Sequence, residues 1–148
     1  MREITTTRFG EIEEDESKII HFSAGLPAFE DAHDFIIIPY DEESPYVFLQ
    51  SVKTPDLAFL MAMPLVFFPD YEVTIDDDVE KELGLTSPEE VVIYAILTLA
   101  GTEIRDLTAN LMAPIVVNAA TRRAKQIVLD RSPYTTKHRL FPHAKEDR

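Results

Sequence analysis

Histidine, acidic and hydroxyl side chains are the groups in this sequence that could support acid–base, metal or nucleophilic chemistry. The histidines include no pair at the one-turn helical spacing of a zinc protease; they are His21, His33, His138 and His143. The acidic run Asp76–Asp78 lacks the alternating ligands and central glycine of a calcium loop. No serine lies in a nucleophile-elbow motif. These spacings predict neither a metal site nor a catalytic site.

Glycine and cysteine usage removes further classes of activity. The four glycines lie far apart, so they form neither a dinucleotide-binding fingerprint nor a phosphate-binding loop. The absence of cysteine excludes a disulfide framework, a thiolate metal site and a cysteine nucleophile. Carboxylates are too numerous for any one pair to be singled out as an acid–base dyad. We therefore predict a protein that is not an enzyme and that uses no cofactor.

The charge distribution favours a protein partner. The chain has 27 acidic and 14 basic residues, with a formal net charge of −13. Residues 1–90 contain 22 acidic and 5 basic side chains, so they repel phosphate and attract a basic partner. Solubility is the simpler explanation of this excess. Basic residues follow at 122–139, beside aromatic Tyr134, but pairing with the acidic surface explains them better than nucleic-acid binding. We predict no direct nucleic-acid binding.

Short apolar segments bounded by proline, glycine, aspartate or serine predict many strands. We therefore expect a mainly β protein, a small antiparallel barrel-like or sandwich domain with a few short helices, as one domain over residues 1–148. The acidic tract Glu11–Glu16 is expected to form a solvated turn. The expected strands are Ile4–Phe9, Lys18–Phe22, Phe35–Ile38, Tyr46–Val52, Ala58–Met63, Leu107–Ala113 and Lys125–Leu129.

Helix signals are confined to the middle of the chain. Asp76 could cap a helix that Gly84 ends. Ser87–Glu90 resembles a capping box, and Gly101 could end a helix there, whereas the β-branched residues that begin the segment 91–99 favour a strand. From residue 141 the tail is rich in charge and is expected to be disordered.

The segment Leu107–Asn118 alternates apolar and polar residues, which predicts a half-buried strand. Pro114 cannot donate to a ladder, so a bend or bulge is expected there. Asn110 and Asn118 could bond the backbone beside that bend.

A second distinctive segment, Ser23–Glu30, follows an apolar strand. Gly25 permits a positive φ and Pro27 can begin a helical turn, after which Phe29 would pack inward.

Together these two segments resemble the flagellar assembly factor FliW family. The family's first motif matches Gly25–Glu30 and its second matches Asn110–Asn118, with Pro64 and Pro69–Tyr71 between them in the family's order. Ala28 departs from the glycine common in the family, which restricts that turn to ordinary backbone angles. The resemblance covers about the whole chain and implies a strand at 91–99, after a short helical turn at 87–90.

The resemblance implies a non-enzymatic cytoplasmic regulator. Such a protein binds the carbon storage regulator CsrA, a basic dimeric RNA-binding protein, and also binds flagellin, so that accumulated flagellin frees CsrA to repress flagellin translation. A general secretion chaperone without translational control is the alternative. No apolar run approaches the length of a membrane span, so we expect no membrane partner. The candidate partner-binding residues are Pro27, Phe29, Glu30, Asp70, Tyr71, Asn110, Pro114, Asn118 and Tyr134.

Overall fold

The computed structural model describes residues 2–26, 29–99, 103, 106–129 and 133–141. Its centre is a closed barrel of seven strands, in which β7 is followed by β6, β5, β4, β3, β10 and β9, and β9 pairs again with β7. The predicted β class and barrel are confirmed. The barrel is mixed, since β10 pairs with β3 in parallel. Its strands are β3 (Ile20–Phe22), β4 (Asp34–Pro39), β5 (Tyr46–Ser51), β6 (Ala58–Ala62), β7 (Val91–Leu99), β9 (Ile115–Asn118) and β10 (Arg123–Gln126).

Alternating apolar residues fill the barrel. Phe22, Phe35 and Leu49 are fully buried, and the Phe22 and Phe35 rings meet edge to face with centroids 5.4 Å apart. Each large apolar side chain buried in this way contributes about 1.5–3 kcal/mol of transfer free energy. This packing fixes the barrel on which the surface segments are mounted.

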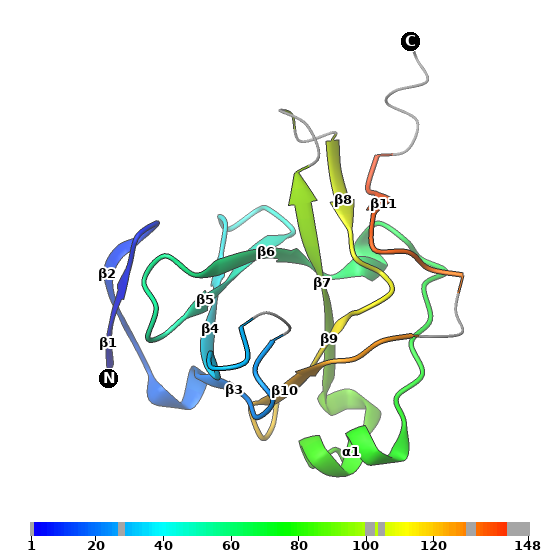
Figure 1. Ribbon diagram of the computed structural model, residues 1–148, viewed down its shortest axis with the longest axis horizontal. Coiled ribbons are helices and arrows are strands. Elements are labelled where there is room, and N and C mark those ends of the chain that lie inside the picture. Colours follow the sequence, from blue (N-terminus) through cyan, green and yellow to red (C-terminus); the bar gives the residue numbers. More distant parts are fainter. Residues whose placement is uncertain (1, 27–28, 100–102, 104–105, 130–132, 142–148) are drawn as a thin grey trace.

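A hairpin of β1 (Arg2–Thr6) and β2 (Gly10–Glu14) lies beside the barrel (Figure 1). The prediction of a solvated turn at Glu11–Glu16 is therefore wrong for its first residues. Ile4 pairs with Ile12 across the hairpin, and both pack against Ile36 and Val52. The gain from burying this apolar face outweighs the low strand propensity of the glutamates that alternate with it.

The predicted bend at Pro114 separates two strands, β8 (Leu107–Ala109) and β9, that pair with the same neighbour. Leu97 of β7 lies opposite Ala109, whereas Tyr94 lies opposite Ile115. The chain therefore advances six residues from Ala109 to Ile115, while β7 advances only three, from Leu97 to Tyr94. The three extra residues form a bulge between β8 and β9. Strand structure is present in the predicted segment on both sides of the bend. The prediction that only one face is buried is wrong, because Thr108 and Asn118 on the polar face are buried as well. A short unpredicted strand, β11 (His138–Arg139), pairs with β8 (Figure 1).

Two of the helical segments agree with the predicted positions. α1 (Asp77–Leu83) ends at Gly84, whose φ is +70°, although the Asp76 side chain makes no capping hydrogen bond. The 3-10 turn η3 (Pro88–Glu90) leads directly into β7, as expected. Gly101 lies outside the described residues, and so does the tail beyond residue 141. The other 3-10 turns are η1 (Glu16–Lys18) and η2 (Pro64–Val66), which were not predicted.

Candidate protein-binding surface

The turn that contains the first motif exposes one aromatic ring and one carboxylate. The Phe29 amide donates to the Leu26 carbonyl at 2.7 Å, and Gly25 turns the chain with a φ of +68°. Phe29 lies edge to face on Phe59, with centroids 5.6 Å apart, yet it remains 41% exposed. The prediction that Phe29 packs inward is therefore only half correct. Glu30 is exposed, and Pro27 and Ala28 lie outside the described residues.

A hollow of about 580 Å³ opens beside this turn. Phe29 and Leu57 contribute its apolar walls, while Glu30, Asp31 and Asp56 contribute carboxylates. No basic side chain lines it among the described residues. An apolar floor with an acidic rim suits a partner segment that carries both apolar and basic side chains.

The second group of candidate residues forms an aromatic cluster. The Tyr71 hydroxyl donates to the Leu111 carbonyl at 2.7 Å, and its ring meets that of Tyr134 with centroids 4.7 Å apart. Burial raises the pKa of the Tyr71 hydroxyl well above its ordinary value. The backbone amide of Glu72 donates to the Tyr134 hydroxyl at 3.1 Å.

This cluster offers less accessible surface than the sequence predicted. Tyr71 is buried and Tyr134 is half-buried, so neither of these candidate partner-binding residues is freely exposed. Asp70, at the start of the same segment, is exposed. The cluster fixes the segment around Asp70 against the bulge that follows β8.

The asparagine side chains of the second motif form hydrogen bonds with the backbone of neighbouring segments. The Asn110 side-chain oxygen accepts from the Ala113 amide at 3.0 Å, as the predicted bend requires. The Asn118 side chain donates to the Leu83 carbonyl at 2.8 Å and accepts from the Ala120 amide at 2.8 Å. Pro114 and Asn118 are buried. Contact between this motif and a partner stays a prediction, and for Asn118 it needs a rearrangement of this conformation.

Sequence reasoning missed two strongly exposed apolar residues. Leu65 and Val66, in η2, are 58% and 60% exposed. The run Met63–Phe68 carried the available signal, because five apolar residues and Pro64 stand there without the alternation of a half-covered strand. A separate hollow of about 600 Å³ includes Leu99 and Tyr40.

The sequence matches the FliW protein family over residues 3–140. The chain belongs to the FliW family. It is 44% identical over 139 residues to the flagellar assembly factor FliW of Geobacillus kaustophilus (strain HTA426), covering 94% of this chain and 95% of that protein. For the FliW of Moorella thermoacetica (strain ATCC 39073 / JCM 9320), the identity is 37% over 145 residues, covering 98% and 92%.

A solved structure supports the same assignment. The crystal structure of a flagellar assembly factor FliW superposes with a TM-score of 0.88 at 41% identity, covering 97% of this chain and 99% of that one. The FliW family consists of non-enzymatic assembly factors, so the prediction that the chain is not an enzyme is confirmed. Within the described part of the chain, no group of three histidine or acidic residues is placed to hold a metal ion. The same part contains no helix long and apolar enough to cross a membrane.

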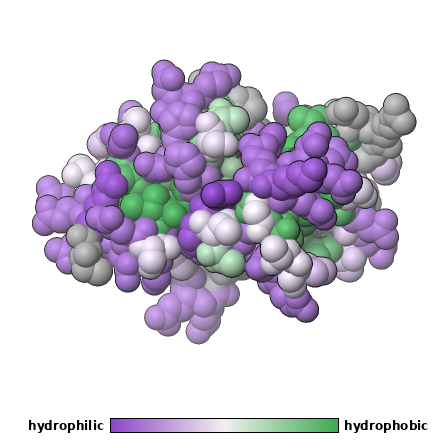
Figure 2. Space-filling view, turned by 90° about the horizontal axis from the view of Figure 1, so that it is seen from below, coloured by the Kyte–Doolittle hydropathy of each residue, from purple (hydrophilic) through white to green (hydrophobic). Residues whose placement is uncertain are grey.

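One face of this FliW family member is predominantly hydrophilic (Figure 2). Figure 2 shows this face, on which hydrophilic residues surround separate small hydrophobic areas. On the outside of the β1–β2 hairpin, Glu3 lies directly opposite Glu13, and Glu11 lies opposite Thr5. The predicted acidic surface is thus built into a paired strand, where the spacing of the carboxylates is fixed.

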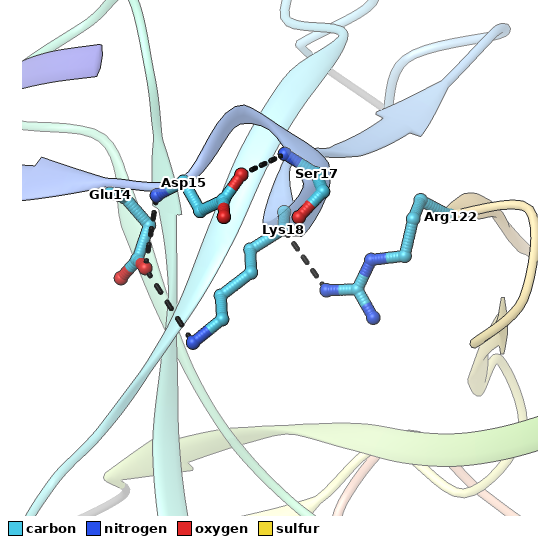
Figure 3. A network of polar contacts seen from close by, with 5 residues as sticks. All are labelled: Glu14, Asp15, Ser17, Lys18 and Arg122. Carbon is cyan, nitrogen blue, oxygen red and sulfur yellow. Dashed lines mark hydrogen bonds and ion pairs between the residues drawn. The ribbon is translucent and has the colours of Figure 1, made fainter. Parts of the chain in front are cut away.

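A polar network connects this hairpin to the barrel (Figure 3). The Arg122 guanidinium donates to the Lys18 carbonyl at 3.0 Å, and the Asp15 side chain accepts from the Ser17 amide at 3.0 Å. That amide lowers the pKa of the Asp15 carboxyl. Lys18 also pairs with Glu14 at 3.8 Å. Arg122 therefore bonds within the molecule, although to a carbonyl group and not to an acidic side chain. Lys125 forms an ion pair with Glu82 at 2.8 Å, which is pairing of the predicted kind.

Proposed function

We propose that the chain is a cytoplasmic partner switch that binds CsrA and flagellin and couples flagellin synthesis to export. Membership of the FliW family over nearly the whole chain carries the proposal. The partners come from the family resemblance noted in the sequence. While flagellin is scarce the chain holds CsrA; when unexported flagellin accumulates, CsrA is released and represses flagellin translation.

The charge of the chain supports a basic partner. The net charge is −13, and the hairpin presents Glu3, Glu11 and Glu13 on one side. Charge complementarity of this kind accelerates association and selects among partners more than it adds affinity. CsrA, as a basic protein, fits this surface.

The candidate contact residues divide by accessibility. Phe29, Glu30 and Asp70 are exposed and are proposed to touch a partner directly. Tyr71 and Asn118 are buried, so we propose that they act by fixing the segments that carry the exposed residues.

A competition experiment tests the switch. Flagellin is titrated into a preformed complex of the chain with CsrA, and free CsrA is measured by size-exclusion chromatography with light scattering. We expect release of CsrA, and linkage requires that CsrA weaken flagellin binding by the same factor. A stable ternary complex with unchanged affinities contradicts the switch and favours the chaperone alternative.

Paired variants test the first motif as a contact surface. Phe29→Ser removes a ring that is 41% exposed, whereas Val128→Ser removes an apolar side chain that is 58% exposed and lies outside both motifs. We expect Phe29→Ser alone to weaken binding of one partner, by about tenfold or more, as a central aromatic contact does. Equal affinities for the two variants contradict a direct role for Phe29.

A further inference from the structure

Half of β7 has a free edge. β6 pairs with β7 at Met61–Ile96 and Ala62–Ala95. The chain then leaves the sheet, because Pro64 cannot donate to a ladder and begins η2. The first half of β7, Val91–Tyr94, pairs with β9 on its other side. The place beside this half that β6 would fill is left without a strand among the described residues.

Hydrogen bonds on both sides of β9 show which backbone groups of β7 face the free edge. The Ala119 amide donates to the Glu90 carbonyl at 2.8 Å, so alternate residues from Glu90 onward direct their polar groups to β9. The Ile127 amide donates at 3.0 Å to the carbonyl of Pro114, the residue that lies opposite it when the β9–β10 register is continued. Alternate residues from Pro114 onward, which include Val116, therefore direct their polar groups to β10. Ile93, which pairs with Val116, therefore points its N–H and C=O away from β9.

Neither of these Ile93 groups has a hydrogen-bond partner within the described part of the chain. A strand edge with unpaired donors and acceptors is a template for another extended chain. Its geometry matches the addition of a peptide strand to a sheet.

A hollow of about 240 Å³ runs along this edge. It touches Val92, which packs on the barrel core, and also Val91 and Ile93, which pack on the outer clusters. Because it reaches both faces of one strand, the hollow lies at the strand's edge. Met63 and Leu65 form its other wall.

The surroundings of the edge select the charge of the incoming chain. A second hollow, of about 410 Å³, shares Val91 and Ile93 with the first and includes Glu80. Neither hollow is lined by a basic side chain among the described residues. The exposed carboxylates next to the lining residues in the chain include Asp70, Glu72 and Glu89. A second copy of this chain would bring the same acidic rim, so self-association here is opposed by like charges.

We propose that an extended segment of CsrA, with apolar side chains and flanking lysine or arginine, adds as a strand to the Val91–Ile93 edge. The inference rests on the proposed function. The segment would bond the Ile93 N–H and C=O, insert apolar side chains beside Leu65, and place its basic residues against the acidic rim.

Two variants of one residue separate the backbone contribution from the side chain. Ile93→Pro and Ile93→Ala both truncate the side chain, but only proline removes the N–H that β9 does not use. Val92, which precedes it, lies in a strand, and that is the backbone region that a following proline requires. We expect CsrA affinity, measured by calorimetry, to be at least tenfold lower for Ile93→Pro than for Ile93→Ala.

A second pair of variants does not depend on the strand backbone. Leu65 is 58% exposed, so Leu65→Arg and Leu65→Glu leave the fold intact. We expect the arginine variant to bind CsrA at least fivefold more weakly than the glutamate variant. If Ile93→Pro fails to fold, as judged by circular dichroism, the Leu65 pair alone tests whether CsrA docks at this edge.

The outcomes separate the two proposals. Failure of the parent chain to bind CsrA rejects the proposed function. Binding by the parent with no difference within either pair overturns the edge as the docking site. Loss of flagellin binding in place of CsrA binding overturns the assignment of this edge to CsrA.

Discussion

At the scale of single residues, two glycines share a backbone conformation and differ in their surroundings. Gly10 and Gly25 have φ values of +71° and +68°. A Cβ at Gly10 would meet nothing within 4 Å, whereas one at Gly25 would lie 2.4 Å from the Glu30 carbonyl oxygen. The first motif therefore needs glycine for space as well as for conformation, and the approach of Glu30 shapes the turn that presents Phe29.

We expect Gly10→Ala to lower the free energy of unfolding by about 1 kcal/mol, which is the cost of the left-handed conformation. Gly25→Ala must also displace backbone, so we expect a loss of at least about 3 kcal/mol, in the range of severe single substitutions. Urea unfolding of both variants gives the comparison. Equal losses of unfolding free energy in the two variants would show that the turn at Gly25 accommodates a Cβ without additional strain.

Tyr71 joins the segment after η2 to the bulge through its hydroxyl. Removing that hydroxyl in Tyr71→Phe leaves the Leu111 carbonyl without this donor, and we expect a loss of about 1–3 kcal/mol near pH 7.

The pH dependence of this loss follows from the raised pKa of Tyr71. Above the ordinary tyrosine pKa of about 10, the unfolded chain releases the proton while the folded chain keeps it, so the parent loses stability as pH rises. Phenylalanine cannot titrate, so the stability gap between parent and variant should narrow between about pH 9 and 11. Burial also raises the pKa values of Tyr46 and Tyr94, and both remain in the variant. A gap that stays constant over this range would contradict a buried, protonated Tyr71.

At the scale of elements, the β1–β2 hairpin carries an unfavourable pair. Glu3 and Glu13 lie directly opposite each other, and like charges in that position destabilise a sheet. We expect Glu13→Lys to raise the free energy of unfolding by about 0.5–1 kcal/mol more than Glu11→Lys, which makes the same charge change opposite Thr5. Thermal unfolding at low and high salt measures the difference, and salt should reduce it. Equal effects of the two variants would show that only the net charge matters.

The hairpin also shows what the sequence could and could not reveal about the elements. Most apolar strands of the barrel were predictable because they are short apolar runs bounded by turn residues. The local signals conflicted at residues 91–99, and the family resemblance supplied the strand there. β2 was missed because its strand signal consists of one Ile12 among glutamates, and its support comes from Ile36, distant in the sequence.

The other features that the sequence did not predict depend on pairing between strands that are distant in the sequence. The parallel contact of β3 with β10 has no local signature, and neither has the shared pairing of β8 and β9 with β7. The same limit applies to the candidate site. The motif residues Asn110 and Asn118 were recognisable, but their hydrogen bonds to Ala113 and Leu83 depend on the bulge and on the position of α1.

At the scale of the whole molecule, the excess of acidic residues and the proposed docking edge give two different routes by which this chain could silence an RNA-binding partner. One is a direct or conformational block of the RNA site. The other is repulsion of RNA phosphates by the 22 acidic side chains of residues 1–90, against 5 basic ones. Exposed charges more than about 10 Å apart are largely screened near 0.1 M salt, so repulsion acts only if acidic groups come close to the RNA-binding groove.

Two groups of substitutions with equal charge change distinguish these routes. One neutralises the outer face of the hairpin with Glu3→Gln, Glu11→Gln and Glu13→Gln; the other neutralises the exposed loop after β4 with Asp41→Asn, Glu42→Gln and Glu43→Gln. If repulsion operates, at least one group should reduce RNA exclusion while CsrA binding is retained, and higher salt should have the same effect on the parent complex. The RNA affinity of CsrA is measured at saturating amounts of each variant, with complex formation checked by light scattering. If both variants bind CsrA and exclude RNA as well as the parent does, repulsion from these surfaces is wrong, because the same complex would then silence CsrA without their charge.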